Sequence, residues 1–264
     1  MDIWKPILNR HKSKFNNKVF PDNFRCLIIG SSGCGKNVLL MRMLLEGKGQ
    51  GHDFLDYNNL IFYSTTINQP ELQLLKCGFE NKLTKKAIID IFKNQHRCPE
   101  EVFQPCDMVD WYKEMILESD ISNKNDYIGD GIQILFSNKP EDVLHCDLLP
   151  KDKKNLVIFD DVVNMKNQEI QKSYFTRGRH NNCNVIYISQ TYYALDKNSI
   201  RNNSNCFIFF KLDRRDKNMI YNDLFSNVEP DKNMFDMFVD NHWKEKYNYI
   251  YLDREEAEIW KSLF

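Results

Sequence analysis

The sequence predicts an α/β fold in which a mostly parallel central sheet is flanked by helices. Three apolar runs carry this prediction, and each one ends in distinctive residues: Cys26 to Ile29 before a glycine-rich segment, Leu156 to Phe159 before two aspartates, and Val185 to Ile188 before a serine and a glutamine. Continuous apolar runs of this kind are typical of strands buried on both faces, as in parallel sheets. Such sheets bind ligands at the carboxyl ends of their strands.

The glycine-rich segment, Gly30 to Lys36, has the spacing of a phosphate-binding P-loop between a strand and a helix. Gly30, Gly33 and Gly35 are expected to supply backbone torsions closed to residues with a Cβ, and to let the main chain approach phosphate oxygens. Lys36 supplies positive charge for the β- and γ-phosphates. We therefore expect ATP to contact Gly30, Ser31, Ser32, Gly33, Cys34, Gly35, Lys36, Asn37 and Val38.

The residue after Lys36 departs from the P-loop pattern, which has Ser or Thr there to ligate Mg²⁺ through a hydroxyl. Here the residue is Asn37. Its side-chain carbonyl is an oxygen ligand for a hard cation, but it is longer than a hydroxyl and requires a rearranged coordination shell. We expect Asn37 to weaken Mg²⁺ binding without abolishing nucleotide binding.

Two acidic residues, Asp160 and Asp161, end the second apolar run about 125 residues after the P-loop. This is the pattern of a Walker B strand, which is buried on both faces and emerges beside the P-loop. We expect Asp160 to hold Mg²⁺ through water. Asp161 is expected to orient the attacking water or to accept its proton.

The third apolar run ends in Gln190, whose amide can donate to one oxygen and accept from another. This predicts a sensor of the γ-phosphate or of the attacking water. Arg177 and Arg179 lie on the segment 168–180, which is expected to cross the sheet before this run. Three roles stay open for these arginines: a finger that reaches the γ-phosphate of a neighbouring subunit, a contact to DNA phosphates, or a solvated loop. Arg201 is a further candidate for the same work.

The remaining elements follow from hydrophobic periodicity and turn residues. Glu46 to Asp53 is polar and glycine-rich, which predicts a loop. Asp213 to Lys217 is predicted to be a charged, solvated turn, so that Arg214 and Arg215 are weak candidates for a DNA path. Further strands are expected at 60–65, 132–136, 206–210 and 247–252, and further helices at 71–75, 85–92, 108–119, 218–226 and 231–238.

The composition fits one large domain. The chain has 264 residues, of which 42 % are hydrophobic, and we expect a basic N-terminal arm at 1–20 followed by a single domain at 21–264. The formal net charge of −1 gives no global signal for nucleic-acid binding. No apolar run has the length of a membrane span and no signal peptide is recognisable, so we expect a soluble intracellular protein without a membrane partner.

The eight cysteines show no paired spacing of the kind found in zinc or redox motifs. They are interpreted as reduced thiols. A loose group of His96, Cys98, Cys106, His145 and Cys146 matches no standard zinc pattern, and we predict no metal there.

Taken together, these motifs resemble a known family. The P-loop with its preceding strand, the Phe159-Asp160-Asp161 strand end, and Arg177-Gly178-Arg179-His180 ahead of a strand that ends in Ser189-Gln190 look like the poxvirus-type genome-packaging ATPases of the FtsK/HerA superfamily. Large DNA viruses, virophages and Polinton-type elements encode such ATPases. The resemblance runs from about Phe20 to about Leu212, and Asn37 departs from the Ser or Thr of the family.

The resemblance implies a RecA-like P-loop NTPase core that assembles into a hexameric or pentameric ring of identical chains. It also implies that Mg²⁺ and ATP drive double-stranded DNA into a capsid, with capsid proteins as partners and the viral assembly site or the virion as the location. Two other functions stay open. One is a nucleotide-binding or structural subunit in which Asn37 prevents hydrolysis, and the other is an unrelated P-loop enzyme such as a kinase or a small-molecule ATPase.

Overall fold

The computed structural model describes residues 20–45, 47–48, 52–53, 55–80, 133–139, 142–165, 168–227, 230–254 and 258–260. The expected N-terminal arm up to residue 19 and the helices expected at 85–92 and 108–119 lie outside the described residues. Among the helices within these ranges, none combines the length and the apolar character that a bilayer crossing requires.

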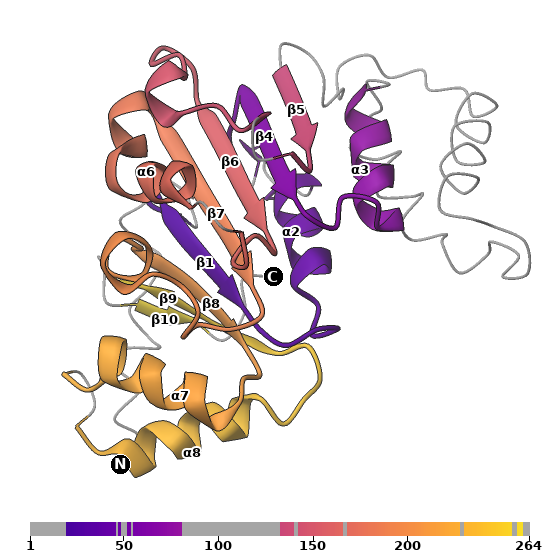
Figure 1. Cartoon of the computed structure of the whole chain (residues 1–264). Helices are drawn as coiled ribbons and strands as arrows, with labels where there is room; N and C mark the ends of the chain where they lie inside the picture. The colour runs from indigo at the N-terminus through magenta and orange to yellow at the C-terminus, as the bar shows by residue number, and fades with distance from the viewer. Residues whose placement is uncertain are drawn as a thin grey trace, which may run out of the picture.

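The centre of the protein is an eight-stranded sheet with the order β10-β9-β8-β1-β7-β6-β4-β5 (Figure 1). Neighbouring strands from β8 to β5 are parallel, and β9 and β10 add an antiparallel edge. The predicted fold class, a mostly parallel sheet, is confirmed. The strands are β1 (Arg25–Ile29), β4 (Asn59–Ser64), β5 (Gln133–Ser137), β6 (Asn155–Asp160), β7 (Cys183–Ser189), β8 (Cys206–Phe210), β9 (Tyr249–Asp253) and β10 (Glu258–Trp260).

Helices cover both faces of the sheet because its central strands are apolar on both sides. Along β1, Cys26 and Ile28 pack into the core on the side of α2, and Leu27 and Ile29 pack into the core on the opposite side, with α6. The first core also receives α3, and the second receives α7 and α8 (Figure 1). The helices are α2 (Lys36–Leu45), α3 (Pro70–Glu80), α6 (Glu169–Arg177), α7 (Arg214–Ile220) and α8 (Lys232–His242).

The strand order brings three polar strand ends together. Strand β7 lies between β1, which leads into the P-loop, and β6, which ends in the aspartates. The register sets their carboxyl ends level, since Ile29 pairs with Ser189 and Ile188 pairs with Asp160. The Gly30 N–H continues this pairing by donating to the Ser189 carbonyl at 3.2 Å. The P-loop, the aspartates and Gln190 therefore meet at one edge of the sheet.

The prediction of a charged turn at Asp213 to Lys217 is wrong, because α7 begins there. The Asp213 carboxylate caps this helix by accepting a hydrogen bond from the Asp216 N–H at 2.8 Å. The Asp216 side chain is itself buried, and its carboxylate oxygens accept the backbone N–H groups of Tyr192 and Tyr193 at 3.0 and 2.9 Å. Both acids therefore satisfy backbone donors instead of solvating a turn.

Two further local predictions are wrong. The segment Glu46 to Asp53, predicted to be a loop, contains a short antiparallel pair, β2 (Gly47–Lys48) with β3 (His52–Asp53). The strand predicted to begin at Tyr247 begins instead at Tyr249, so that Tyr247 lies in the turn before β9. Strand β10 was not predicted, because three residues are too few to display a period.

Candidate nucleotide-binding site

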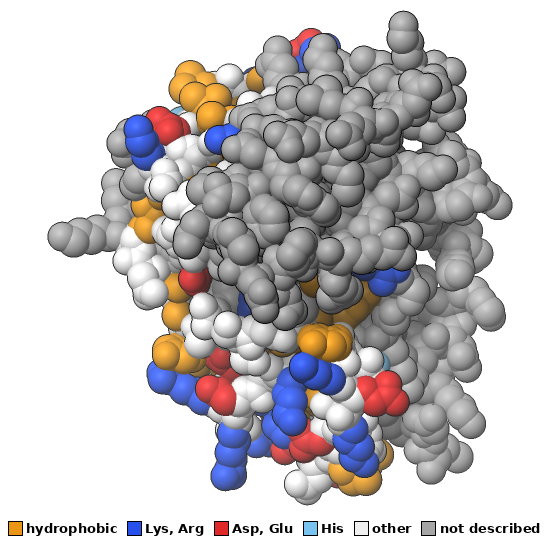
Figure 2. Space-filling view, turned by 90° about the vertical axis from the view of Figure 1, so that its right-hand side faces the viewer, with side chains coloured by type: hydrophobic (Ala, Val, Ile, Leu, Met, Phe, Trp, Pro, Cys, Tyr) orange, Lys and Arg blue, Asp and Glu red, His pale blue; other side chains and the backbone are white. Residues whose placement is uncertain are grey.

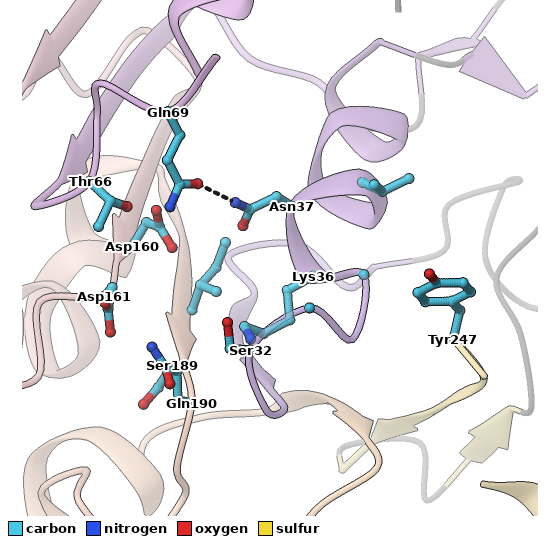
Figure 3. Close-up of a pocket in the computed structure, with 14 residues that line it drawn as sticks. Ser32, Lys36, Asn37, Thr66, Gln69, Asp160, Asp161, Ser189, Gln190 and Tyr247 are labelled. Carbon is cyan, nitrogen blue, oxygen red and sulfur yellow. Dashed lines mark hydrogen bonds between the residues drawn. The ribbon is translucent and has the colours of Figure 1, made fainter. Parts of the chain in front are cut away.

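A pocket lies at the carboxyl edge of the sheet, over the ends of β1, β6 and β7 (Figure 3). Its volume of about 480 Å³ lies within the range of roughly 300–1,000 Å³ that is usual for small-molecule sites. Gly30, Ser31 and Cys34 belong to the same loop but are not among its lining residues. The residues of the predicted site that line it are Ser32, Gly33, Gly35, Lys36, Asn37, Val38, Asp160, Asp161 and Gln190.

The P-loop glycines are required for two different reasons. Gly33 and Gly35 have φ of 72° and 102°, in the left-handed region that residues with a Cβ rarely adopt. Gly30 has no such φ, so the torsional reason predicted for it is wrong. It is required for space, because a Cβ at this position would lie 2.6 Å from Cys34 Sγ and 2.6 Å from Phe210 Cβ.

The Lys36 side chain folds back over the loop. Its ammonium donates to the carbonyls of Gly30 at 2.6 Å and Ser31 at 2.8 Å. Helix α2 begins at Lys36, so the unpaired N–H groups of its first turn also lie at the pocket. A loop ammonium and a helix N-terminus together give this part of the pocket the chemistry of an anion site.

Asp160 is the most buried charged group of the pocket. It is 4 % exposed, and its Oδ2 accepts a hydrogen bond from Ser64 Oγ at 2.8 Å. Burial raises the pKa of the Asp160 carboxyl above its ordinary value, and the charge of Asp161 raises it further. Hydrogen bonds from Ser64 and Thr66 and the charge of Lys36 oppose this rise in pKa. A carboxylate held in this way gains from a cation placed beside it.

Asp161 and Gln190 follow the ends of adjacent strands and lie on the same side of the pocket (Figure 3). Asp161 has a φ of 52°, and its N–H donates to the Ile188 carbonyl at 3.2 Å. Its own carbonyl accepts the Thr65 hydroxyl at 3.0 Å. These bonds fix the backbone where the chain leaves β6, so the Asp161 carboxylate and the Gln190 amide are presented together.

Asn37 is held by a residue outside the P-loop. Its Nδ2 donates to Gln69 Oε1 at 3.1 Å, and Gln69 lies just before α3 (Figure 3). Because the amide nitrogen is used in this bond, the Asn37 carbonyl oxygen is turned away from Gln69 and is available to another partner. The replacement of Ser or Thr by Asn is therefore accompanied by a contact that fixes the longer side chain.

Five lining residues were not among the predicted site residues: Ile188 and Ser189 at the end of β7, and Thr66, Gln69 and Tyr247. Thr66 and Gln69 follow the carboxyl end of β4, and β4 pairs with β6. The signal that singled out the other motifs, polar residues after a buried parallel strand, could have found them. Tyr247 carries no such signal, since it precedes a strand instead of following one.

Arg177 and Arg179 lie at the opposite edge of the sheet from the pocket. Helix α6 returns the chain from the carboxyl end of β6 to the amino end of β7, and Arg177 is its last residue. Neither arginine lines the pocket. A role for either one in this chemistry therefore requires the pocket of a second copy, and that role stays a prediction.

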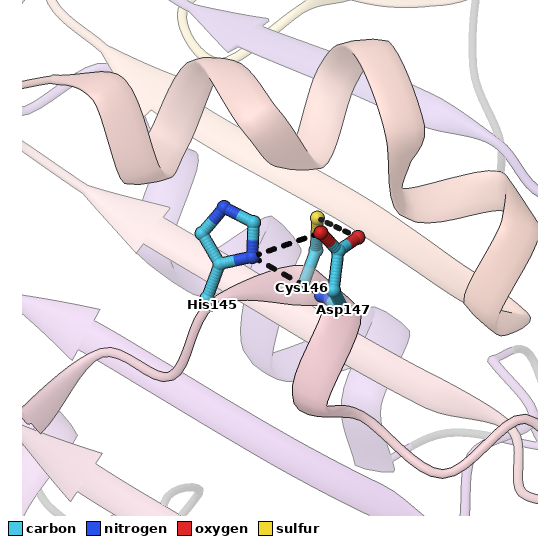
Figure 4. A group of neighbouring side chains, drawn as sticks. All are labelled: His145, Cys146 and Asp147. Atoms are coloured by element: carbon cyan, nitrogen blue, oxygen red, sulfur yellow. Dashed lines mark hydrogen bonds and ion pairs between the residues drawn. The ribbon is translucent and has the colours of Figure 1, made fainter.

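Arg177 is anchored within its own chain. The side chains of His145, Cys146 and Asp147 gather within 4.8 Å of one another (Figure 4), and the Arg177 guanidinium lies 3.0 Å from His145 Nε2 and 3.3 Å from Asp147 Oδ2. The buried Cys146 thiol lies 3.6 Å from the Ser173 carbonyl, and burial raises its pKa. The Arg177 guanidinium contacts both His145 and Asp147, so this cluster is described as an anchor for Arg177.

The prediction that Arg201 is a further candidate for an arginine finger is wrong, because its side chain is buried in the interior of the protein. Arg201 Nη1 lies 2.8 Å from Asp223 Oδ2, and its guanidinium carbon lies 5.0 Å from the centre of the Tyr192 ring. The side chain is only 9 % exposed. It cannot reach a phosphate on another subunit without breaking this ion pair.

Arg214 and Arg215 lie exposed at the start of α7. The Arg215 guanidinium carbon lies 3.7 Å from the centre of the Tyr193 ring. In the view of Figure 2, basic and acidic side chains are intermixed on the lower part of the molecule. Lys217 of α7, for example, lies 2.9 Å from Asp240 of α8. The described residues of α7 and α8 therefore carry charges of both signs, and a DNA path through Arg214 and Arg215 stays a prediction.

Comparison with known proteins gives a distant likeness of fold. No protein-family model matches the chain, and no curated protein matches its sequence. The structure of the genome packaging NTPase B204 from Sulfolobus turreted icosahedral virus 2 in complex with ATP-gammaS is similar with a TM-score of 0.47 and 11 % identity, over 90 % of this chain and 96 % of that one. VirB4 of Thermoanaerobacter pseudethanolicus is similar with a TM-score of 0.42 and 13 % identity, over 96 % and 90 % of the two chains.

A DnaB-like replicative helicase is similar at a TM-score of 0.41 and 10 % identity, over 91 % of this chain and 59 % of that one. Likeness at this level concerns the fold and carries no activity from one chain to another. The fold class is therefore assigned from the structure itself. A P-loop lies between β1 and α2, and the strand β6, which ends in two aspartates, is separated from β1 by one strand. These features define a P-loop NTPase fold.

Proposed function

We propose that this protein is an ATPase that hydrolyses ATP with Mg²⁺ and uses the energy to move double-stranded DNA into a capsid, as a ring of identical chains. The observation that carries the hydrolysis is the convergence of Lys36, the Asp160–Asp161 pair and Gln190 on one pocket from three adjacent strands. The DNA-packaging part of the proposal rests on the resemblance of the sequence motifs to packaging ATPases.

The residues at the acidic end of the pocket fit a hard cation. Asp160 offers a buried carboxylate, and Asn37 offers a carbonyl oxygen that its bond to Gln69 leaves free. Thr66 adds a hydroxyl to the same lining. Oxygen ligands of these kinds are those that Mg²⁺ accepts, usually with several waters retained. When bound, Mg²⁺ would neutralise charge on the β- and γ-phosphates.

Each motif then has a defined task. The Lys36 ammonium exchanges its loop carbonyls for phosphate oxygens, and the first-turn N–H groups of α2 bind the phosphates from the other side. Asp161 accepts a proton from the attacking water or orients it, while Gln190 contacts that water or the γ-phosphate. Their placement on one side of the pocket allows both to act on the same water.

Arg179 is the better candidate for a finger that acts on a neighbouring copy. Arg177 is held by His145 and Asp147, whereas the exposed Arg179 makes no hydrogen bond or ion pair with any residue in the described ranges. Two exposed leucines, Leu144 at 44 % and Leu148 at 71 % exposure, lie in the segment whose turn Cys146–Leu148 contacts the turn that carries Arg179. Exposed apolar side chains near an unpaired arginine are the composition expected of a subunit contact.

The test is steady-state ATP hydrolysis with Mg²⁺, with and without long double-stranded DNA, using Lys36→Ala as the blank. Hydrolysis above the blank that rises with DNA supports the motor. Arg179→Ala is expected to lower kcat strongly with little change in ATP affinity, and Arg177→Ala is the matched comparison. Hydrolysis that DNA does not change would favour an unrelated P-loop enzyme.

A second candidate function is a subunit that binds nucleotide but does not hydrolyse it. The presence of Asn37 in place of the Ser or Thr of the P-loop pattern favours this function. Asn37→Thr separates the two proposals. A large gain in turnover with Thr identifies Asn37 as the block, whereas little change means that the Gln69-supported Asn37 serves in the cation shell. Equal activity of the wild type and Lys36→Ala, in folded protein that binds ATP, would leave only the non-catalytic role.

A further inference from the structure

We propose that Tyr247 forms the nucleobase end of the pocket, with its ring stacked on the base of the bound nucleotide. The inference rests on the proposed nucleotide site and adds to it a residue from the C-terminal part of the chain. Tyr247 lines the same pocket as Asp160 and Lys36, although the turn that carries it lies between α8 and β9.

The two ends of the pocket differ in chemistry. Asp160, Asp161 and Gln190 gather at one end, and Tyr247 lies beyond the P-loop at the other (Figure 3). Val38 and Tyr247 are large hydrophobic side chains that stay exposed, at 63 % and 56 %. Both line the pocket. A flat, weakly polar part of a ligand, such as a nucleobase, would cover these exposed apolar side chains beside the P-loop.

The P-loop fixes the direction of a nucleotide between these ends. The loop lysine reaches the β- and γ-phosphates, and the backbone N–H groups of a P-loop cradle the α- and β-phosphates. The γ-phosphate therefore lies toward Asp160, since the acidic end is where its cation would be held. The α-phosphate, and with it the sugar and the base, must leave on the side of Gly35, which is the side of Tyr247.

The backbone conformation of Tyr247 is strained, which indicates that the surrounding structure imposes the position of this residue. Its φ is 74°, a left-handed conformation that is a genuine outlier for a bulky residue. Asn248 holds the turn, because its Nδ2 donates to the His242 carbonyl at 3.1 Å and its N–H donates to the Glu245 carbonyl at 3.4 Å. Strain of this kind persists where the surrounding structure imposes it, and it is common at ligand sites.

The ring also sits close to the loop. A Cβ on Gly35 would approach Tyr247 Cδ1 to 3.3 Å, so the ring lies directly beside the P-loop backbone. The Lys246 ammonium lies 4.7 Å from the centre of the same ring. A strained, exposed aromatic ring held against a phosphate loop has no role in the core, and base stacking accounts for both its exposure and its position.

The experiment compares two ligands on the full chain by calorimetry: ATP, and tripolyphosphate, which has no sugar or base. Tyr247→Ala is expected to weaken ATP binding roughly 5- to 150-fold, the range for loss of one base–aromatic stack, while tripolyphosphate binding changes by less than about twofold. Tyr247→Phe should bind ATP as the wild type does, because the ring and not the hydroxyl makes the contact. Tyr193→Ala removes a partly exposed tyrosine outside the pocket and should change neither affinity.

Two results would overturn the inference: unchanged ATP affinity in Tyr247→Ala, or an equal loss for ATP and tripolyphosphate, which would mean that the ring supports the loop instead of the base. Thermal melting of each variant excludes a general folding defect. Lys36→Ala distinguishes this failure from failure of the proposed function. If Lys36→Ala binds ATP as tightly as the wild type, the pocket is not the nucleotide site at all.

Discussion

Gly30→Ala tests whether the start of the P-loop depends on close contact with strand β8. The added methyl group would lie 2.6 Å from both Cys34 Sγ and Phe210 Cβ, where carbon contacts normally need about 3.5–4.0 Å. The sulfur can rotate away, but Phe210 is 2 % exposed and its Cβ is fixed by the sheet pairing of β8 with β9. The loop entry must therefore move by about 1 Å, and overpacking of this kind costs about 1–3 kcal/mol.

In a domain of this size such a cost lowers the melting temperature by about 2–12 °C, measured by circular dichroism or calorimetry. We also expect ATP hydrolysis to fall, by about 100-fold for a 1 Å displacement of the phosphate cradle. Gly178→Ala is the matched control, because its Cβ would meet nothing closer than 3.6 Å and its φ is −51°. The reasoning is refuted if Gly30→Ala melts within about 1 °C of Gly178→Ala.

Three further predictions concern buried charge and the Asn37 contact. Asp160→Asn should raise the melting temperature of the metal-free protein at pH 8, because burial raises the pKa of Asp160 and its ionisation in the folded state lowers stability. This stabilisation should shrink as the pH falls toward the ordinary Asp value of 3.8, where the wild-type carboxyl is protonated. Arg201→Met should cost about 3 kcal/mol in urea denaturation, because Asp223 is left without its 2.8 Å partner in a site that is 16 % exposed. Gln69→Ala should raise the Mg²⁺ concentration for half-maximal ATP hydrolysis roughly two- to tenfold, because the Asn37 side chain is no longer fixed.

Each of these predictions has a control within the chain or an outcome that would contradict it. A lower melting temperature of Asp160→Asn at pH 8 would contradict the sign of the argument. For Arg201, the exposed Lys197 lies 4.0 Å from the same carboxylate, so Lys197→Met should cost far less than Arg201→Met. For Gln69, an unchanged Mg²⁺ dependence of Gln69→Ala would mean that the hydrogen bond to Gln69 does not position Asn37.

The interior of the sheet was predictable because its strands are continuous apolar runs. The runs at Cys26, Leu156, Val185 and Cys206 all became strands with bounds within about two residues of the prediction. The predictions were wrong where the role of a side chain does not depend on the hydrophobic periodicity of a helix or strand. Asp213 looked like a turn residue because its role as a helix cap depends on the backbone that follows it.

The sequence by itself determined the phosphate cradle and the acidic strand end, because a P-loop is a local structure whose spacing is written in consecutive residues. It also determined that β6 and β7 are buried strands. Only the tertiary structure decided that β7 lies between β1 and β6, that Gln69 reaches Asn37, and that Tyr247 returns to the P-loop. These contacts join residues from 32 to more than 200 positions apart in the chain, and strand order, which no local pattern encodes, sets them.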